Sequence, residues 1–475
     1  MKKFINKLLI IFLIAGTIVS CDNNLDQLPY DEFATDNAYI TASDFENGIR
    51  GVYLALIQGG IYGSSDAGSM LSAPDVLSDN VTLAQGGRFT KRYLHDYNFN
   101  SNSTMQTLYE DAYELIYRAN VVLFYAETFE GESKANIVAE AKALRALAHF
   151  NLVTLFGKIP TQSGDANSSL GIAYLTEPDP SIEPSRLSVG ETYNLIVQDL
   201  VDARADINEN NPEARMGKDA VNTILSRVYL YMGQWQNAIN AANAVTEGVA
   251  SMDNFVGIWE DTSRDGLIFY IPNAEPVLGN SIGVAWSQGS ASALIPEYVA
   301  SFELFNLFAD DDIRKSAYIL PATSGGSTYN GIKKLFGRPG QSNGEVDYKI
   351  FRASEAYLNI AEAEFALGHD GAARNALDEV RSNRYTSPSS GETGSALSDA
   401  IRLERRLEFA FEYQRFLDIK RWGLSVQRSG SGDQADGSGT PSDVLSLSAG
   451  DNKFQLPISQ ESIDVNPNLQ QNPGY

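Results

Sequence analysis

Apolar side chains recur at the period of an α-helix over long stretches of this chain. Residues 106–129 carry them at Leu108, Tyr109, Ala112, Leu115, Ile116, Ala119, Val122 and Leu123. Residues 134–156 carry them at Ile137, Ala141, Leu144, Ala148, Leu152 and Leu155, and Gly157 and Pro160 follow. Spacings of three and four place these side chains on one helix face, and Gly and Pro stop helices. The pattern predicts two long helices, over 106–129 and 134–156.

A third helix has a clear start signal. Three prolines, at positions 178, 180 and 184, indicate a rigid connector before it. Ser188 then precedes Glu191 by three residues, the spacing of a capping box, in which each side chain bonds the other residue's backbone amide. We expect this helix to run to about Asn208.

Two segments 135 residues apart resemble each other, namely residues 230–238 and 365–373. Gly233 matches Gly368, and Ala238 matches Ala373. Glycine frees a tight turn and a small residue lets two helix axes approach, so both segments predict helical hairpins like those of tetratricopeptide arrays. Chance similarity between alanine-rich hairpins is the alternative interpretation.

Residues 248–344 differ from the helical blocks because Gly, Ser and Asn are frequent there. Short β-like runs such as residues 267–271 interrupt this region, and long irregular segments in compact proteins often carry function. Residues 429–442 form a second Gly/Ser/Asp-rich stretch, which we expect to be a mobile surface insertion. The chain as a whole is predicted to be mainly α, with a large irregular, loop-rich face and few short strands.

The N-terminus has the pattern of an export signal. Lysines at positions 2, 3 and 7 precede an apolar run over residues 8–14, and residues 18–21 read Ile-Val-Ser-Cys. This ending resembles a bacterial lipobox, so residues 1–20 are interpreted as a lipoprotein signal peptide and Cys21 as the acceptor of a diacylglycerol and an N-acyl chain. An ordinary secretory signal or a short membrane anchor is the alternative, although the apolar run is too short to span ~30 Å of hydrocarbon.

The residues after Cys21 are polar and acidic, as in Asp22 and Asp26. This stretch is similar to the signal by which some outer-membrane lipoproteins reach the cell surface, and a solvated tether is the other interpretation. We expect an outer-membrane protein held by its lipid and facing the cell exterior.

The mature chain is strongly acidic. Loss of the leader leaves 33 basic and 60 acidic residues, a formal charge of −27 against −24 for the whole chain. Such a surface repels phosphates, which argues against a nucleic-acid partner. Because Cys21 is the only cysteine, no disulfide is expected, and the fold must depend on a core drawn from 43% hydrophobic residues.

Catalytic and metal-binding patterns are weak. Three histidines, at positions 95, 149 and 369, lack metal-ligand spacing. Residues 340–344 match the G-x-S-x-G string around Ser342, but that motif requires a preceding strand and a following helix. Asp433 and Asp436 lack the alternating spacing of a calcium loop. We therefore expect no enzyme activity, metal site or cofactor, and leave open whether a structural calcium ion binds.

Aromatic residues in loops are the better candidates for a ligand site. An aromatic ring matches the C–H face of a sugar, and Arg, Asn, Asp or Gln matches its hydroxyls. Trp286 lies among small and polar residues, and Arg88, Phe89 and Tyr93 follow a Gly-Gly pair. These four residues are the predicted ligand contacts, and the alternative is that the rings fold back onto the body.

Several blocks, taken in order, resemble the SusD/RagB family of outer-membrane nutrient-binding lipoproteins. They comprise residues 141–146 with 156–160, residues 193–203, the charged block 404–412 continuing to Trp422, and the closing segments 456–458 and 471–475. The resemblance runs from Cys21 to Tyr475. We interpret the block from Glu404 to Arg421 as an ion-pair-laced structural helix, so this motif marks architecture and not the ligand site.

The resemblance implies a single domain over 21–475, with an N-terminal part over about 22–215 and a C-terminal part over about 270–475. It implies tetratricopeptide-like hairpins in a right-handed superhelical scaffold. It also implies a non-catalytic protein that binds oligosaccharides and delivers them to a SusC-like TonB-dependent transporter, over which it sits as a lid. An oligopeptide-binding, RagB-like role is the alternative.

Overall fold

The computed structural model describes residues 38–211, 214–273, 281–290, 293–338 and 344–475, so the predicted leader, Cys21 and Ser342 lie outside the described residues. The longer helices are α2 (Ala42–Leu56), α5 (Gln106–Ala126), α6 (Lys134–Phe156), α7 (Val189–Asp206), α8 (Lys218–Tyr231), α9 (Trp235–Ala242), α10 (Met252–Trp259), α13 (Ala353–Ala366), α14 (Asp370–Arg381) and α15 (Gly394–Glu408). Shorter helices are α3 (Ala73–Val76), α4 (Arg92–His95), α11 (Phe302–Leu307), α12 (Ile313–Tyr318), α16 (Arg415–Arg421) and α17 (Gln460–Val465).

The predicted long helices are confirmed. In the predicted capping box, the Ser188 hydroxyl accepts from the Glu191 amide at 3.2 Å, and the Glu191 carboxylate accepts from the Ser188 amide at 3.0 Å. Helix α6 differs from an amphipathic helix, because almost every side chain from Ala139 onward is buried. It contacts α2, α5, α7 and α8, so it forms the centre of the N-terminal half.

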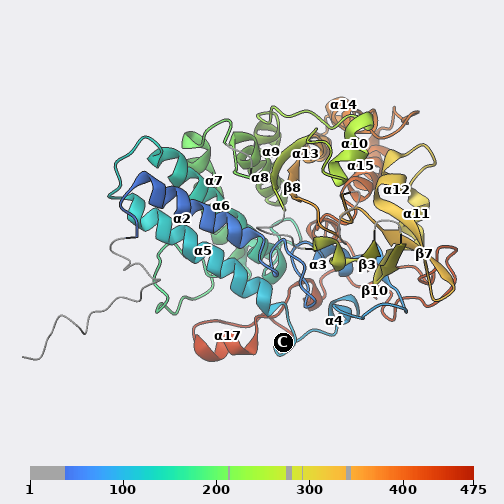
Figure 1. Cartoon of the computed structure of the whole chain (residues 1–475), viewed down its shortest axis with the longest axis horizontal. Helices are drawn as coiled ribbons and strands as arrows, with labels where there is room; N and C mark the ends of the chain where they lie inside the picture. The colour runs from blue at the N-terminus through green and yellow to red at the C-terminus, as the bar shows by residue number, and fades with distance from the viewer. Residues whose placement is uncertain (1–37, 212–213, 274–280, 291–292, 339–343) are drawn as a thin grey trace, which may run out of the picture.

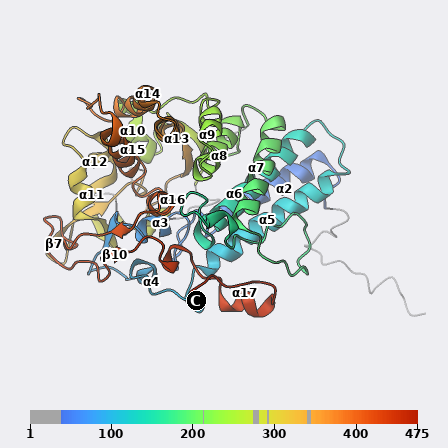
Figure 2. The ribbon, with the colours of Figure 1, turned by 180° about the vertical axis from the view of Figure 1, so that it is seen from behind.

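The two matching segments form helical hairpins as predicted. Helix α8 turns into α9 through Gly233, and α13 turns into α14 through Gly368, at positive φ angles of 70° and 81°. Helix α9 packs directly against α13, which joins the two hairpins. Helical pairs follow one another from α2 and α5 to α14 and α15 across the molecule (Figures 1 and 2). The handedness of a superhelix stays a prediction.

The strands are short, and β3, β7 and β10 lie near α3, whereas β8 lies beside α13 (Figure 1). A four-stranded sheet has the order β1-β5-β7-β6, and its first pair is antiparallel, with Leu83 opposite Tyr298. The run 267–271 is strand β2, as predicted, and it pairs with β8. The strands are β1 (Val81–Leu83), β2 (Leu267–Ile271), β3 (Ser287–Ser290), β4 (Ala293–Pro296), β5 (Tyr298–Ala300), β6 (Ile319–Ser324), β7 (Ser327–Ile332), β8 (Tyr348–Arg352), β9 (Val426–Gln427) and β10 (Ser446–Leu447).

The stretch 429–442 is fastened to the body, so the expectation of a loosely held insertion is wrong. The buried Asp433 carboxylate accepts from the amides of Gln85 and Thr440 at 2.9 and 2.8 Å. The Ala435 amide donates to the Thr328 carbonyl on β7 at 2.9 Å. These contacts place the stretch over the end of β1.

The single helix expected over 404–421 is also wrong, because the chain leaves the helix between α15 and α16. Phe411 and Tyr413 have left-handed φ angles of 65° and 59°. The buried carboxylate of Asp75, on α3, accepts from both of their amides at 3.1 Å. These bonds stabilise a turn that the charge pattern alone does not indicate.

No helix within the described ranges is both long enough and apolar enough to cross a bilayer.

Candidate functional site

The segment after β1 carries three of the four predicted ligand contacts. It is fastened at Gln85 by Asp433, and at Gly87, whose amide donates to the Ala84 carbonyl at 3.0 Å. A Cβ atom at Gly87 would lie 2.8 Å from Cα of Glu297, so only glycine fits this approach of two backbones. The loop is therefore held close to the segment between β4 and β5.

The backbone of this segment is strained. Phe89 and Lys91 have φ angles of 60° and 57°, in the left-handed region that bulky residues rarely adopt. Such conformations cost about 1–3 kcal/mol each, and they cluster at ligand-binding sites. The interactions with Glu297 help to hold this shape, because its carboxylate accepts from Arg88 and Thr90 and lies 3.8 Å from the Lys91 ammonium.

Arg88 is held between two carboxylates. Its guanidinium donates to buried Glu297 at 2.9 Å and to exposed Asp66 at 3.3 Å, while its side chain remains 34% exposed. A third bond reaches the Val284 carbonyl at 3.4 Å. The guanidinium therefore has a fixed position and still faces solvent.

Arg88 lines an open cleft of about 480 Å³. The other residues around the cleft are Ile57, Gln58, Gly59, Gly63, Ser64, Asp66, Ser281 and Val284. The loop after α2 thus supplies one wall, and the residues before β3 supply the other. Gly60 seats that loop against α5, because a Cβ there would lie 2.6 Å from Cα of Leu108 and its amide donates to Asp111 at 2.8 Å.

Phe89 and Tyr93 lie near Arg88 in the chain but differ in environment. The Phe89 side chain is 37% exposed, with the Arg92 guanidinium 5.8 Å from its ring centroid. The half-buried Tyr93 donates its hydroxyl to the Ala67 carbonyl at 2.6 Å. Burial raises the pKa of Tyr93 above its usual value, so this hydroxyl stays a donor at neutral pH. Phe89 thus presents a ring to solvent, whereas Tyr93 supports the Asp66 loop.

The prediction for Trp286 is wrong. Its side chain is only 1% exposed and packs edge-on against the rings of Tyr298 and Phe411, with centroids 6.4 and 5.9 Å away. Its carbonyl accepts from the amides of Glu297 and Tyr298 at 2.9 and 3.0 Å. The small neighbours in sequence let this ring turn inward, so Trp286 belongs to the core and offers no face to a ligand.

Sequence reasoning missed the polar wall formed by Gln58, Ser64 and Asp66. These residues lie in a loop rich in Gly and Ser between α2 and α3. The Gly59-Gly60 pair indicates a loop there, just as the pair at 86–87 indicates the loop that carries Arg88. Only the fold, however, brings the two loops to the same cleft.

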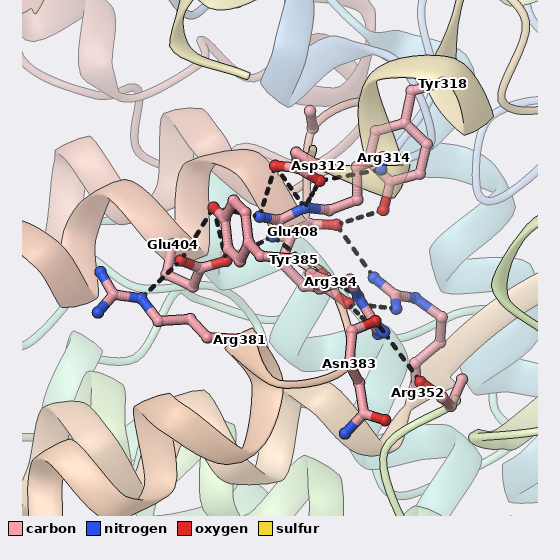
Figure 3. Close-up of polar contacts among 12 residues, drawn as sticks. Asp312, Arg314, Tyr318, Arg352, Arg381, Asn383, Arg384, Tyr385, Glu404 and Glu408 are labelled. Atoms are coloured by element: carbon pink, nitrogen blue, oxygen red, sulfur yellow. Dashed lines mark hydrogen bonds and ion pairs between the residues drawn. The ribbon is translucent and has the colours of Figure 1, made fainter. Parts of the chain in front are cut away.

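The charged block beginning at Glu404 is a buried ion network (Figure 3). Glu408 accepts from Arg384 at 2.9 Å, from Arg352 at 2.7 Å and from Arg314 at 3.2 Å. Burial would raise the pKa of Glu408, but Arg384, Arg352 and Arg314 outweigh it and hold that pKa well below its ordinary value. The network joins α12, β8, α14 and α15. This agrees with the interpretation of the charged block as structural. Its ion pairs, however, connect different elements and not successive turns of one helix.

The histidines and the G-x-S-x-G string that the sequence offers do not come together in the described residues. Within the described ranges, no group of three His, Cys, Asp or Glu side chains could hold a metal ion. The histidines are separate: His149 is buried and stacks on Tyr174 at 3.8 Å, and His369 is exposed beside Glu364. The chain after Gly344 continues into strand β8, where a nucleophile elbow would require a helix.

Comparisons with known proteins agree with this architecture. The model described as "SusD family" matches residues 310–475, and that described as "Starch-binding associating with outer membrane" matches residues 24–230. A "SusD-like protein P2" of Formosa agariphila is 25% identical, covering 100% of both chains.

Two solved structures share the fold. A "putative sugar binding protein" of Bacteroides vulgatus ATCC 8482 superposes with a TM-score of 0.81 at 23% identity, covering 92% of this chain and 100% of that chain. A "SusD superfamily protein" of Bacteroides thetaiotaomicron gives 0.79 at 25% identity, covering 91% and 100%. Family models in both halves, a full-length relative and these folds lead to one conclusion: this chain belongs to the SusD-like family.

Proposed function

We propose that this protein binds oligosaccharides in the cleft at Arg88 and does not alter them chemically. The observation that carries the proposal is the fixed, solvent-facing guanidinium of Arg88, beside a strained backbone that exposes the ring of Phe89. The family description mentions starch binding and outer-membrane association, and one fold relative carries the words "sugar binding", which supports the same ligand class.

The chemistry of the cleft suits a sugar. Gln58, Ser64, Asp66 and Arg88 line the cleft and supply donors and acceptors for hydroxyl groups. The exposed ring of Phe89, which follows Arg88 in the chain but does not line the cleft, offers an apolar face to a ligand that extends beyond it. One aromatic contact adds ~0.5–1.5 kcal/mol beyond burial, so a site with one or two such contacts binds in the millimolar to micromolar range. That affinity suits a protein that captures a ligand and then releases it.

The remaining parts of the proposal concern location and delivery. Acylated Cys21 anchors the protein in the outer membrane, and the helical body faces the cell exterior. A SusC-like TonB-dependent transporter is its partner, which receives the ligand when the lipoprotein closes over the barrel. The family description, which mentions association with the outer membrane, supports the location in this proposal.

Calorimetry on the mature chain tests the ligand class. A panel of α- and β-linked oligosaccharides is titrated alongside a panel of mixed oligopeptides. The proposal expects heat of binding with at least one glycan, and expects weaker binding in Gln58→Ala, because this exposed side chain lines the cleft.

Lys315→Ala serves as a control, because this lysine lies on α12, outside the cleft lining, and pairs with exposed Asp310. Binding of peptides alone would establish the oligopeptide role instead. If Gln58→Ala and Asp66→Ala both bind glycan as tightly as the parent protein, the cleft is not the glycan-binding site.

A further inference from the structure

Asp66 places a negative charge at the surface of the cleft, beside Arg88. Its side chain is 65% exposed and lines the cleft, whereas the Glu297 side chain, which also pairs with Arg88, is only 2% exposed. The Tyr93 hydroxyl holds the loop of Asp66 in place, because it donates to the carbonyl of the next residue, Ala67, at 2.6 Å. Asp66 is therefore a positioned carboxylate that a ligand in the cleft meets directly.

The bonds of Arg88 to the described residues leave one of its N–H groups for a ligand. A guanidinium carries five N–H donors. Two of them bond Glu297, at 3.2 and 2.9 Å, and a third bonds the Val284 carbonyl at 3.4 Å. One N–H of Nη1 bonds Asp66 at 3.3 Å, and the other has no partner among the described residues. The free donor thus lies next to the carboxylate of Asp66.

This donor and this acceptor suit two neighbouring hydroxyl groups of a neutral sugar. One hydroxyl accepts from the free N–H of Arg88, and the next donates to Asp66, since an ionised carboxylate only accepts. The other described residues of the lining are uncharged, among them Gln58, Ser64 and Ser281. A neutral diol therefore satisfies both charged side chains without displacing either.

A ligand with a carboxylate or sulfate group fits this pair poorly. Its oxygens accept from Arg88 but have no proton to donate to Asp66. An anion at the free N–H would lie about 5 Å from the Asp66 carboxylate, because the two N–H bonds of Nη1 diverge by about 120°. Repulsion at this separation lowers affinity about fourfold in water, and more where the cleft excludes water. The charges of Arg88 and nearby Lys91 do not offset it, because Glu297 and Asp66 balance them.

We propose that Asp66 makes the cleft selective for neutral oligosaccharides, against chains that carry uronic acids or sulfate esters. The inference rests on the proposed function, because it concerns the ligand of the same cleft. An arginine in a cleft often binds anions. Here Glu297 and Asp66 already pair with the guanidinium, so Arg88 serves as a hydrogen-bond donor to hydroxyl groups.

Calorimetry with matched pairs of sugars on the mature chain tests this selectivity. Malto-, cello-, galacto- and manno-oligosaccharides are each compared with the same sugar after oxidation of its primary hydroxyls to carboxylates. In the parent, the neutral form should bind about fourfold or more tightly. Asp66→Asn should lower this ratio to about one or below, because it removes the charge and keeps an acceptor. Asp310→Asn removes an exposed carboxylate outside the cleft lining and should leave the ratio unchanged.

Salt provides a readout that a change in folding does not imitate. Raising the ionic strength from about 0.01 to 1 M shortens the Debye length from about 30 to 3 Å, so the preference should shrink more in the parent than in Asp66→Asn. An oxidised sugar that binds the parent as tightly as its neutral form, or an equal ratio in parent and Asp66→Asn, overturns the inference and leaves glycan binding in place. Absence of heat with every neutral and oxidised sugar would instead remove the proposed function, and this inference with it.

Discussion

The carboxylate of Glu408 accepts a hydrogen bond from Nε of Arg384 at 2.9 Å, and both side chains are inaccessible to solvent. Three arginines share this one carboxylate, and Glu412 and Asp312 balance the remaining charge. A network of this kind tolerates poorly the loss of one member, because the surviving charges stay buried.

Glu408→Gln is therefore expected to lower the free energy of unfolding by about 3–5 kcal/mol, since it leaves buried guanidinium groups without their counter-charge. Urea denaturation followed by circular dichroism measures the change. Glu379→Gln on exposed α14 is the control and should stay within about 0.5 kcal/mol of the parent. A similar small change in Glu408→Gln would contradict the structural role of the network.

His95 makes stability depend on pH. Burial, together with the nearby Arg428 guanidinium, lowers the pKa of His95 to about 4. The unfolded state takes up a proton near pH 6.5 and the folded state does not, so stability is fully present above pH 6.5 and falls as pH drops towards 4. The loss is about 3 kcal/mol. His95→Gln should make the stability profile less steep between pH 6.5 and 4 without abolishing its slope, because burial lowers the pKa of His149 as well. Urea denaturation at several pH values measures the change.

Gly87 and Gly86 form a matched pair for testing the cleft. Gly87→Ala forces the loop away from Glu297 and should weaken glycan binding about tenfold, since overpacking costs about 1–3 kcal/mol. Gly86→Ala meets its nearest atom at 4.0 Å and should bind like the parent. Calorimetry measures both variants. Equal binding by the two would mean that the position of Arg88 does not matter to the ligand.

Phe89 is expected to act as the aromatic platform. Phe89→Ala should weaken glycan binding about two- to twelvefold, which corresponds to the loss of ~0.5–1.5 kcal/mol. Phe124→Ala removes an exposed ring from α5, outside the cleft lining, and should leave glycan affinity unchanged. An unaltered dissociation constant for Phe89→Ala would exclude this ring from the site.

Trp286, unlike Phe89, should matter for stability and not for glycan affinity. Trp286→Phe is expected to lower the free energy of unfolding by about 1–3 kcal/mol, because it leaves a cavity against Tyr298 and Phe411. Its effect on glycan affinity should be less than twofold, as the ring has no exposed face. Thermal unfolding and calorimetry on the same sample separate the two quantities.

The helices could be predicted from the sequence because their signals are local. The period around Leu144, the capping box at Ser188 and the turn glycines Gly233 and Gly368 each act within a few residues, and each appears in the fold as expected. Nothing local reveals that α6 is covered on all sides, since that depends on which helices pack around it.

The candidate cleft could be predicted only in part. The Gly-Gly pair at 86–87 points to Arg88 and Phe89, but the two carboxylates that hold Arg88, Asp66 and Glu297, are 22 and 209 residues away from it. Trp286 was misplaced because its neighbours in sequence are small, while its neighbours in space are aromatic. The break between α15 and α16 was missed because Asp75, which stabilises it, lies more than 300 residues earlier.

The separation between the ion network and the Arg88 loop has an evolutionary consequence. Glu408 joins α15 to α12, to β8 and to the turn after α14 in the interior, whereas Arg88 and Phe89 of the loop remain partly exposed at the surface. A lineage could therefore exchange side chains in that loop, and so change the ligand that the proposed cleft prefers, while the buried charges of the scaffold stay intact.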